Sequence, residues 1–321
     1  MKQTVYITRK LPEDIINTLS LHFHVRMWEE ENIPVPRDIL LKEVEDIDAL
    51  ICLLTDKIDE EVISRAPHLK IISNVAVGYN NIDIAAAVKR GIQVTNTPGV
   101  LTETTADLTF ALLMATARGV TTASEALRNG KWGAWSLMEF TGQDIYSATL
   151  GIIGLGRIGE ALVKRAKGFD MNVLYYNRSR KQDKEQELDI HYAELNDLLQ
   201  KADYVCLMIP YSTEVHHLIG KEELSLMKPT AILINTARGG LVDEDALYQA
   251  LKNRDIWAAG LDVFEIEPVP ADHHLLSLNN VVTLPHIGSA SYKTRMSMAQ
   301  LAVENVVSVL GGGEALTPVQ M

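Results

Sequence analysis

The sequence lacks any apolar run long enough to cross a membrane, and its first residues, MKQTVYITRKLPED, contain no signal-peptide core. It has only two cysteines, Cys52 and Cys206, which lie in apolar runs without a Cys-x-x-Cys pattern. Such cysteines are typical of buried, reduced thiols in a cytosolic protein. Positively charged residues are also fewer than negatively charged ones: 30 Lys and Arg against 42 Asp and Glu give a net charge of −12. We therefore predict a cytoplasmic protein that binds neither membranes nor nucleic acid.

The histidines lack the spacing of a metal site. His216-His217 and His273-His274 are adjacent pairs, whereas metal-binding histidines are usually separated by a few residues. We interpret both pairs as loop histidines and predict no metal centre.

A Gly-x-Gly-x-x-Gly pattern in residues 150–159, LGIIGLGRIG, is the most informative feature present. It follows a predicted buried strand and precedes a predicted helix that begins near Glu160. Gly154 permits the tight turn, Gly156 lets a pyrophosphate approach the backbone, and Gly159 lets the helix lie close to the strand. The pattern predicts a dinucleotide-binding unit. Its predicted cofactor contacts are Gly154, Gly156 and Gly159.

The end of the next predicted strand indicates which dinucleotide binds. An acidic residue at this place usually holds the ribose 2′-OH of NAD, but here Asn177 is followed by Arg178, Ser179 and Arg180. Because no carboxylate is present here, a 2′-phosphate would not be repelled, and the arginines can bind it through charge-assisted hydrogen bonds. We expect NADP(H) to be preferred, with NAD(H) also tolerated, and contacts from Asn177, Arg178 and Ser179. A basic surface turn without a cofactor role is the alternative.

The chain of 321 residues is long enough for about two domains. Strand and helix patterns alternate over the first hundred residues, break at Asn96-Thr-Pro-Gly99, and then resume with six further strands. Such alternation predicts parallel sheets covered by helices. We predict an α/β fold with a doubly wound, Rossmann-type dinucleotide-binding domain at 99–287. A flavodoxin-like α/β substrate domain is expected to be discontinuous, at 1–98 and 288–321.

Three polar segments follow predicted strands of the second domain, at the edge where open α/β sheets bind ligands. They contribute Arg238, Glu267 and His286. Hydride transfer to a 2-oxo acid needs a cation for the carboxylate and carbonyl, which Arg can supply. It also needs an acid for the developing alkoxide, which His can supply, and a neighbouring carboxylate would stabilise the protonated His. Each residue alone is typical of a surface position, but together they predict a catalytic group.

The same segments belong to a longer set of motifs. These are Asn74-Val-Ala-Val-Gly-Tyr-Asn-Asn-Ile-Asp83, Thr97-Pro-Gly99, Ala106-Asp-Leu-Thr109, Trp132-x-x-Trp135, GIIGLGRIG, NTARGG, GLDVFEIEP and PHIGSAS. On these motifs the chain resembles the D-isomer-specific 2-hydroxyacid dehydrogenases, and among them the glyoxylate/hydroxypyruvate reductases, from about Ile47 to Leu310. Many relatives read Glu-Glu-Glu-Pro where this chain reads Glu265-Ile266-Glu267-Pro268, so the middle acid is absent.

The resemblance implies a role for each matching residue. Arg238 would bind and orient the substrate, and His286 would act as the acid in reduction with Glu267 as its partner. Val77 and Gly78 would offer backbone N–H groups to the substrate carboxylate. The further implied contacts with the cofactor are Leu155, Arg157 and Ile158 at the pyrophosphate, and Pro210, Thr236, Asp262 and Gly288. Trp135 would reach the substrate site of a neighbouring subunit.

These observations predict an NADPH-linked reductase that converts a small 2-oxo acid into the 2-hydroxy acid and works as a homodimer. Glyoxylate, hydroxypyruvate and 2-oxogluconate all remain open as substrates. Two alternatives also remain. One is an enzyme that is similar to phosphoglycerate dehydrogenase, which the lack of a long C-terminal regulatory extension disfavours. The other is a dinucleotide-sensing, corepressor-like binding protein, which would bind the cofactor but turn over poorly.

Overall fold

The computed structural model describes residues 2–319 and divides into two compact units. The first unit contains the chain up to Leu101 and again from Ala290 onward, and the second unit is Thr102–Ser289. Both boundaries lie within three residues of the positions expected from the sequence. Among the helices of the described chain, none combines the length and the apolar character that crossing a bilayer requires.

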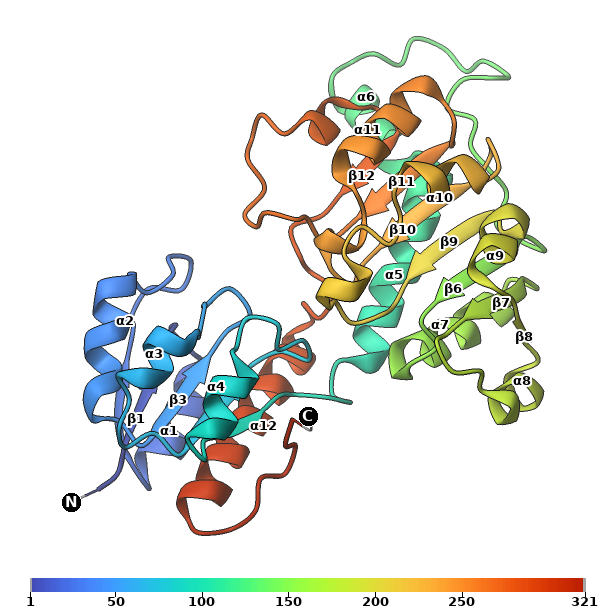
Figure 1. Ribbon diagram of the computed structural model, residues 1–321. Helices are drawn as coiled ribbons and strands as arrows, with labels where there is room; N and C mark the ends of the chain where they lie inside the picture. The colour runs from blue at the N-terminus through green and yellow to red at the C-terminus, as the bar shows by residue number, and fades with distance from the viewer. Residues whose placement is uncertain (1, 320–321) are drawn as a thin grey trace. The chain divides into compact units, whose positions relative to one another are not determined.

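The sheet of the first unit has five parallel strands in the order β2-β1-β3-β4-β5, which is the flavodoxin-like order. Successive side chains of a strand point to opposite faces. Ile71 of β4 therefore shares one core with residues of α1 and α12, whereas Ile72 shares another with residues of α2, α3 and α4. Figure 1 shows these helices around the strands of the unit. The elements are β1 (Thr4–Ile7), α1 (Glu13–Ser20), β2 (His24–Met27), α2 (Arg37–Glu43), β3 (Ala49–Cys52), α3 (Glu60–Ser64), β4 (Ile71–Asn74), α4 (Ile84–Lys89), β5 (Gln93–Thr95) and α12 (Tyr292–Leu310).

The sheet of the second unit has seven parallel strands in the order β12-β11-β10-β9-β6-β7-β8. Ile152 and Ile153 of β6 pack into separate cores on its two faces. The strands are β6 (Thr149–Ile153), β7 (Asn172–Tyr176), β8 (His191–Tyr192), β9 (Tyr204–Leu207), β10 (Ile232–Asn235), β11 (Ala258–Leu261) and β12 (Val281–Thr283). The helices are α5 (Thr102–Ala117), α6 (Val120–Arg128), α7 (Arg157–Lys167), α8 (Gln182–Leu188), α9 (Leu195–Lys201), α10 (Lys221–Leu226) and α11 (Glu244–Asn253).

The predicted fold class, an α/β protein with two parallel sheets, is confirmed. The second sheet has one strand more than the six that we predicted, because β8 is only two residues long and shows no alternation in the sequence. Its strand order reverses between β6 and β9. Ligands of doubly wound folds bind at the carboxyl ends of the strands beside such a reversal. A ligand site is therefore expected in the loops after β6, β9, β10, β11 and β12.

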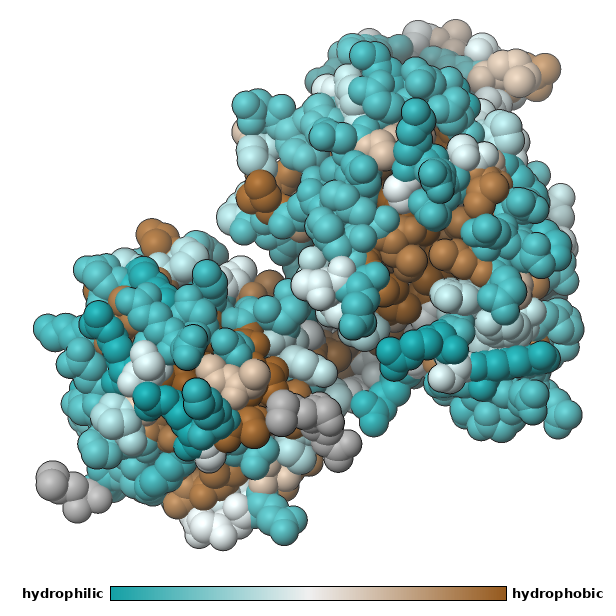
Figure 2. Space-filling model, viewed as in Figure 1, coloured by the Kyte–Doolittle hydropathy of each residue, from teal (hydrophilic) through white to brown (hydrophobic). Residues whose placement is uncertain are grey.

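A long loop separates α6 from β6 and extends from its unit (Figure 1). It carries large apolar side chains that are more than half exposed, and Figure 2 shows tan to brown atoms along it. These side chains are Trp132, Trp135, Leu137 and Met138. Large exposed apolar patches usually mark interaction surfaces.

Candidate active site

The glycine-rich loop adopts a conformation that requires glycine. Gly154 has a φ of 106°, and a Cβ there would lie 2.6 Å from the Ile209 side chain. A Cβ at Gly159 would lie 2.5 Å from the Gly154 carbonyl oxygen, so its absence lets the helix approach the strand. A Cβ at Gly156 would meet nothing within 4 Å. The loop is thus closely packed at Gly154 and Gly159 and open beside Gly156, as a bound pyrophosphate needs.

Helix α7 begins at Arg157 and not near Glu160 as we expected. The prediction failed because the second and third glycines of the motif were taken as loop residues, whereas Gly156 is the N-cap and Gly159 lies in the first turn. No side chain caps this N-terminus. The first N–H groups of α7, on Arg157 and Ile158, are therefore available for phosphate oxygens.

At the end of β7, Asn177 forms a hydrogen bond with the glycine-rich loop, and Arg178 is available to bind a ligand. The Asn177 side-chain oxygen accepts a hydrogen bond of 2.7 Å from the Leu155 N–H, so that N–H is already occupied. Arg180 forms two hydrogen bonds of 2.7 Å with Glu185. Arg178 and Ser179 are exposed. Within residues 2–319 Arg178 makes no hydrogen bond or ion pair, so its guanidinium is the one free to bind an anion.

Glu185 is held as a carboxylate by its neighbours. Its hydrogen bonds from Arg180 and from the Tyr175 hydroxyl, the latter 2.8 Å long, lower the pKa of Glu185 to about 2. The carboxylate is therefore charged at every working pH, and it keeps Arg180 in a fixed position.

The loop after β12 is organised by one buried carboxylate. Asp262 follows β11 and is fully buried. Its two side-chain oxygens accept hydrogen bonds of 2.7 and 2.8 Å from the N–H groups of Ile287 and Gly288. Burial raises the pKa of Asp262, and these N–H groups offset the shift only in part. The predicted cofactor residues Asp262 and Gly288 thus bind each other. The His286 N–H also donates to the Asp262 carbonyl oxygen at 2.8 Å, which holds the His286 backbone in place.

His286 and Glu267 form a hydrogen-bonded pair. The distance from His286 Nδ1 to Glu267 Oε2 is 2.7 Å, and the other Glu267 oxygen accepts the Phe264 N–H at 3.0 Å. Burial alone would raise the pKa of Glu267, but the hydrogen bond and charge of His286 outweigh it, so the pKa is lowered. His286 Nε2 has no hydrogen-bond partner in the described part of the chain. It is the nitrogen left for exchanging a proton with a ligand.

Arg238 lies in the electrostatic field of the same pair. Burial lowers the pKa of its guanidinium, while the charge of Glu267 opposes that shift. Its carbonyl oxygen accepts a hydrogen bond of 2.8 Å from the Asn235 side chain. A Cβ at the next residue, Gly239, would lie only 1.8 Å from the Phe264 carbonyl carbon. The loops after β10 and β11 therefore pack tightly together, which brings a cation, a carboxylate and an imidazole to one edge of the sheet.

The remaining predicted residues of this unit lie around that edge or away from it. Thr236 is buried, and its hydroxyl contacts the Thr109 hydroxyl at 2.7 Å. Pro210 is exposed just after β9. Trp135 lies on the long loop before β6 and is 76% exposed.

In the first unit, Val77 and Gly78 follow β4 in a loop whose carbonyl groups are held. The Asn96 side chain donates to the Val77 carbonyl at 2.8 Å, and the Asn74 side chain donates to the Gly78 carbonyl at 2.8 Å. Within residues 2–319, the N–H groups of Val77 and Gly78 donate to no other group. Two neighbouring free N–H groups can bind a carboxylate.

Sequence reasoning missed the residues that position others. Asn74, Asn96 and Glu185 hold functional groups through side-chain hydrogen bonds. Asn74 begins one of the family motifs, which was a signal for its importance. No sequence pattern indicated Asn96 or Glu185, because their partners are set by the way loops meet in space.

Comparison with known proteins gives consistent matches. The family model described as D-isomer specific 2-hydroxyacid dehydrogenase, NAD binding domain, matches residues 110–288. The chain is 51% identical to a glyoxylate reductase of Korarchaeum cryptofilum and 52% identical to one of Pyrococcus horikoshii, each over 97% of this chain and 94% of the relative. A solved NADPH-dependent glyoxylate/hydroxypyruvate reductase from Sinorhizobium meliloti, in complex with NADP and malonate, matches with a TM-score of 0.89 and 34% identity. That match covers 99% of this chain and 97% of the other.

Proposed function

This chain belongs to the D-isomer specific 2-hydroxyacid dehydrogenase family of NAD(P)-dependent oxidoreductases, and we propose that it reduces glyoxylate with NADPH. Membership confirms the resemblance noted in the sequence. The glyoxylate reductases that are about half identical over nearly the whole chain support this substrate. Hydroxypyruvate and 2-oxogluconate are proposed as further substrates.

The observation that carries the reaction type is the 2.7 Å hydrogen bond between His286 and Glu267. Bound NADPH would supply the hydride that becomes the new C–H bond of the product. His286 Nε2 would donate the proton that the carbonyl oxygen takes up, and Glu267 would stabilise the imidazolium before the transfer. Arg238 would bind the substrate carboxylate and polarise its carbonyl. The resemblance also assigns carboxylate binding to the N–H groups of Val77 and Gly78, and we propose that role for them here.

The preference for NADPH rests on the end of β7. No acidic side chain is present at positions 177–180, and Arg178 is free to pair with a 2′-phosphate. Replacing Arg178 with Ala should raise the KM for NADPH about tenfold, since one charge-assisted contact contributes roughly 1.4 kcal/mol. The KM for NADH should change little. An equal effect on both cofactors would contradict this assignment.

A homodimer is the proposed assembly. The exposed side chains of the loop between α6 and β6, Trp135 among them, form an apolar surface of the kind that protein partners cover. Light scattering coupled to gel filtration should give twice the chain mass of 35.6 kDa. Replacing Trp135 and Leu137 with Ser should shift that mass toward the monomer.

The deciding experiment is a panel of 2-oxo acids assayed with NADPH and NADH by absorbance of the reduced nicotinamide. We expect the highest kcat/KM for glyoxylate with NADPH. A higher value for 3-phosphohydroxypyruvate would favour a phosphoglycerate dehydrogenase-like function. Cofactor binding without any turnover would favour a dinucleotide-sensing protein.

A further inference from the structure

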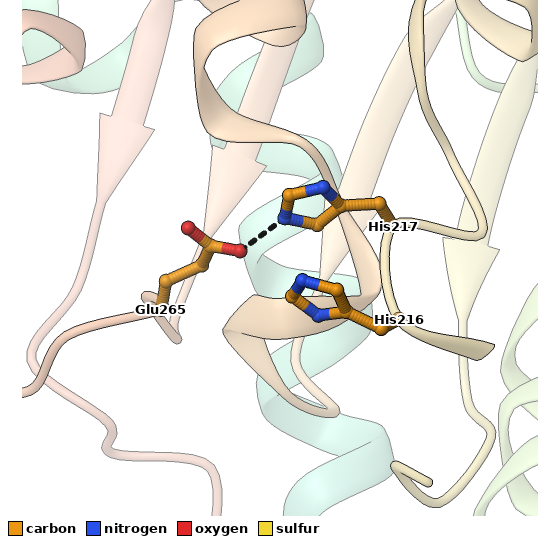
Figure 3. A group of neighbouring side chains, drawn as sticks. All are labelled: His216, His217 and Glu265. Carbon is orange, nitrogen blue, oxygen red and sulfur yellow. Dashed lines mark hydrogen bonds and ion pairs between the residues drawn. The ribbon is translucent and has the colours of Figure 1, made fainter. Parts of the chain in front are cut away.

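A second group of ionisable side chains lies outside the catalytic residues and comprises His216, His217 and Glu265, here called the His-His-Glu cluster. The two histidines follow a short 3-10 helix, η2 (Thr213–Val215), and Glu265 lies on the loop after β11. One possible ligand atom from each residue lies within 4.8 Å of the other two. Figure 3 shows the two rings beside the Glu265 carboxylate, with His217 Nε2 hydrogen-bonded to Glu265 Oε1.

The backbone on both sides of the cluster is fixed. The His217 N–H donates to the Gly240 carbonyl at 2.9 Å. The Glu265 N–H donates at 2.9 Å to the side chain of Glu244, which is itself nearly buried. The three side chains are thus presented from anchored positions, although about a third of the His217 and Glu265 side-chain surfaces remains exposed.

The surroundings of His216 favour use of its Nε2 atom. Its Nδ1 lies 3.2 Å from the Tyr211 hydroxyl, whose oxygen can accept a hydrogen bond from the Nδ1–H group. Metal-bound histidines generally donate their other ring N–H to a neighbouring acceptor, which fixes the ring and makes the ligating nitrogen more basic. Tyr211 supplies this acceptor.

We propose that the His-His-Glu cluster binds one divalent transition-metal ion, with Zn²⁺ as the best fit. Two imidazole nitrogens and one carboxylate oxygen are a donor set that Zn²⁺ prefers, and they leave a fourth position for water. The ion replaces the proton shared by His217 and Glu265. Ligands at about 2.0–2.1 Å from a tetrahedral ion lie roughly 3.3 Å apart. The Glu265 carboxylate must therefore withdraw slightly.

The two imidazole rings must also turn. They are stacked, with centroids 3.8 Å apart and planes inclined by 26°, whereas a metal ion lies in the plane of each ring that binds it. His216 is exposed, so its ring can rotate about χ2 without opening the core. The bound ion would connect the loop after η2 to the loop that carries Glu267.

The test uses the untagged full-length chain, stripped of metal with EDTA and desalted at pH 7.5. Zn²⁺ titrated by calorimetry should bind with one equivalent per chain, and Co²⁺ should give the visible absorption of a nitrogen- and oxygen-ligated ion. E265Q, H216Q and H217Q should each weaken Zn²⁺ binding by at least about tenfold, because loss of an outer-shell partner alone already costs about 10–100-fold.

A matched control is available in the second adjacent pair, His273-His274, whose rings are also stacked and lie near Glu244 and Asp245. H274Q should leave Zn²⁺ binding unchanged. Failure of the wild-type chain to bind Zn²⁺, survival of binding in all three cluster variants, or its loss in H274Q would each overturn the proposal. Circular dichroism in EDTA shows whether each variant is folded. H216Q changes an exposed residue, so it still tests the proposal if H217Q does not fold. Because the readout is metal binding, its outcome does not depend on the proposed reductase activity.

Discussion

The loop after β11 carries two glutamates, two residues apart, and each pairs with a histidine from another loop. Glu267 pairs with His286, and both side chains are only 24% exposed. Glu265 pairs with His217, and about a third of each side chain is exposed. Glu267 takes a second hydrogen bond from the Phe264 N–H, and His286 is fixed through the neighbours that bind Asp262. The first pair, here called the rigid pair, is therefore more enclosed and has an additional hydrogen bond, whereas the second pair is more exposed to solvent.

This difference teaches that the environment, more than the residue types, decides what a His–Glu pair can do. A pair with fixed geometry and restricted solvent suits proton transfer to a substrate. A pair that can open suits the exchange of a proton for a metal ion.

The two His–Glu pairs should differ most in how much kcat falls when the histidine of each pair, His286 or His217, is replaced with Ala. H286A should lower kcat for glyoxylate reduction by about 10²–10⁴-fold, which is the usual contribution of a positioned general acid. H217A should lower it by less than about tenfold. Steady-state assays at saturating NADPH measure both values. Similar losses in the two variants would show that the pairs do not differ in the way proposed.

Substitution of the arginine beside the rigid pair should affect substrate binding. R238K keeps the positive charge but loses the planar fork that binds a carboxylate with two hydrogen bonds. We expect the KM for glyoxylate to rise roughly tenfold to a hundredfold, with a smaller change in the KM for NADPH. A loss confined to kcat would instead assign Arg238 to the chemical step alone.

The hydrogen bond between Glu267 and His286 should also affect how the free energy of unfolding depends on pH. The folded-state pKa of Glu267 is lowered, so its ionised form stabilises the folded chain at pH values above its unfolded pKa of about 4.3. That stabilisation is lost as the pH falls through the folded-state pKa. Urea unfolding of wild type and E267Q should therefore differ most near pH 7, by about 1.5–3 kcal/mol for a hydrogen bond to a charged group. The difference should shrink below pH 4.

E265Q provides the control for that measurement. Because its carboxylate is more exposed, solvent screens the ion pair, and we expect its effect on the unfolding free energy at pH 7 to be at most about 1 kcal/mol. An E265Q effect as large as that of E267Q would remove the distinction between the pairs.

The fold was predictable because its signals are local. Alternating strand and helix patterns indicate parallel sheets, and the carboxyl ends of parallel strands share one edge. The sequence could therefore direct Arg238, Glu267 and His286 to that edge. It could not give the start of α7, because a glycine in a helical first turn looks like a loop glycine.

The His-His-Glu cluster was beyond the reach of sequence spacing. Two adjacent histidines contain no ligand pattern, and their third donor lies 48 residues further along the chain from His217. The role of Asp262 was hidden for a similar reason. Its motif indicates importance, but only the loop geometry shows that its oxygens bind the backbone around His286.

The smallest expected effect concerns a second comparison of the same kind, between Arg178, which is free, and Arg180, which Glu185 holds with two hydrogen bonds. E185Q removes the charge that holds Arg180 and lets it reach a 2′-phosphate beside Arg178. We expect the KM for NADPH to fall about twofold to threefold and the KM for NADH to stay constant, since surface ion pairs contribute up to about 1 kcal/mol. The double variant E185Q/R180A should return the KM for NADPH to the wild-type value. Equal changes for both cofactors would mean instead that Glu185 acts by holding α8 in place, because only a released arginine distinguishes the two dinucleotides.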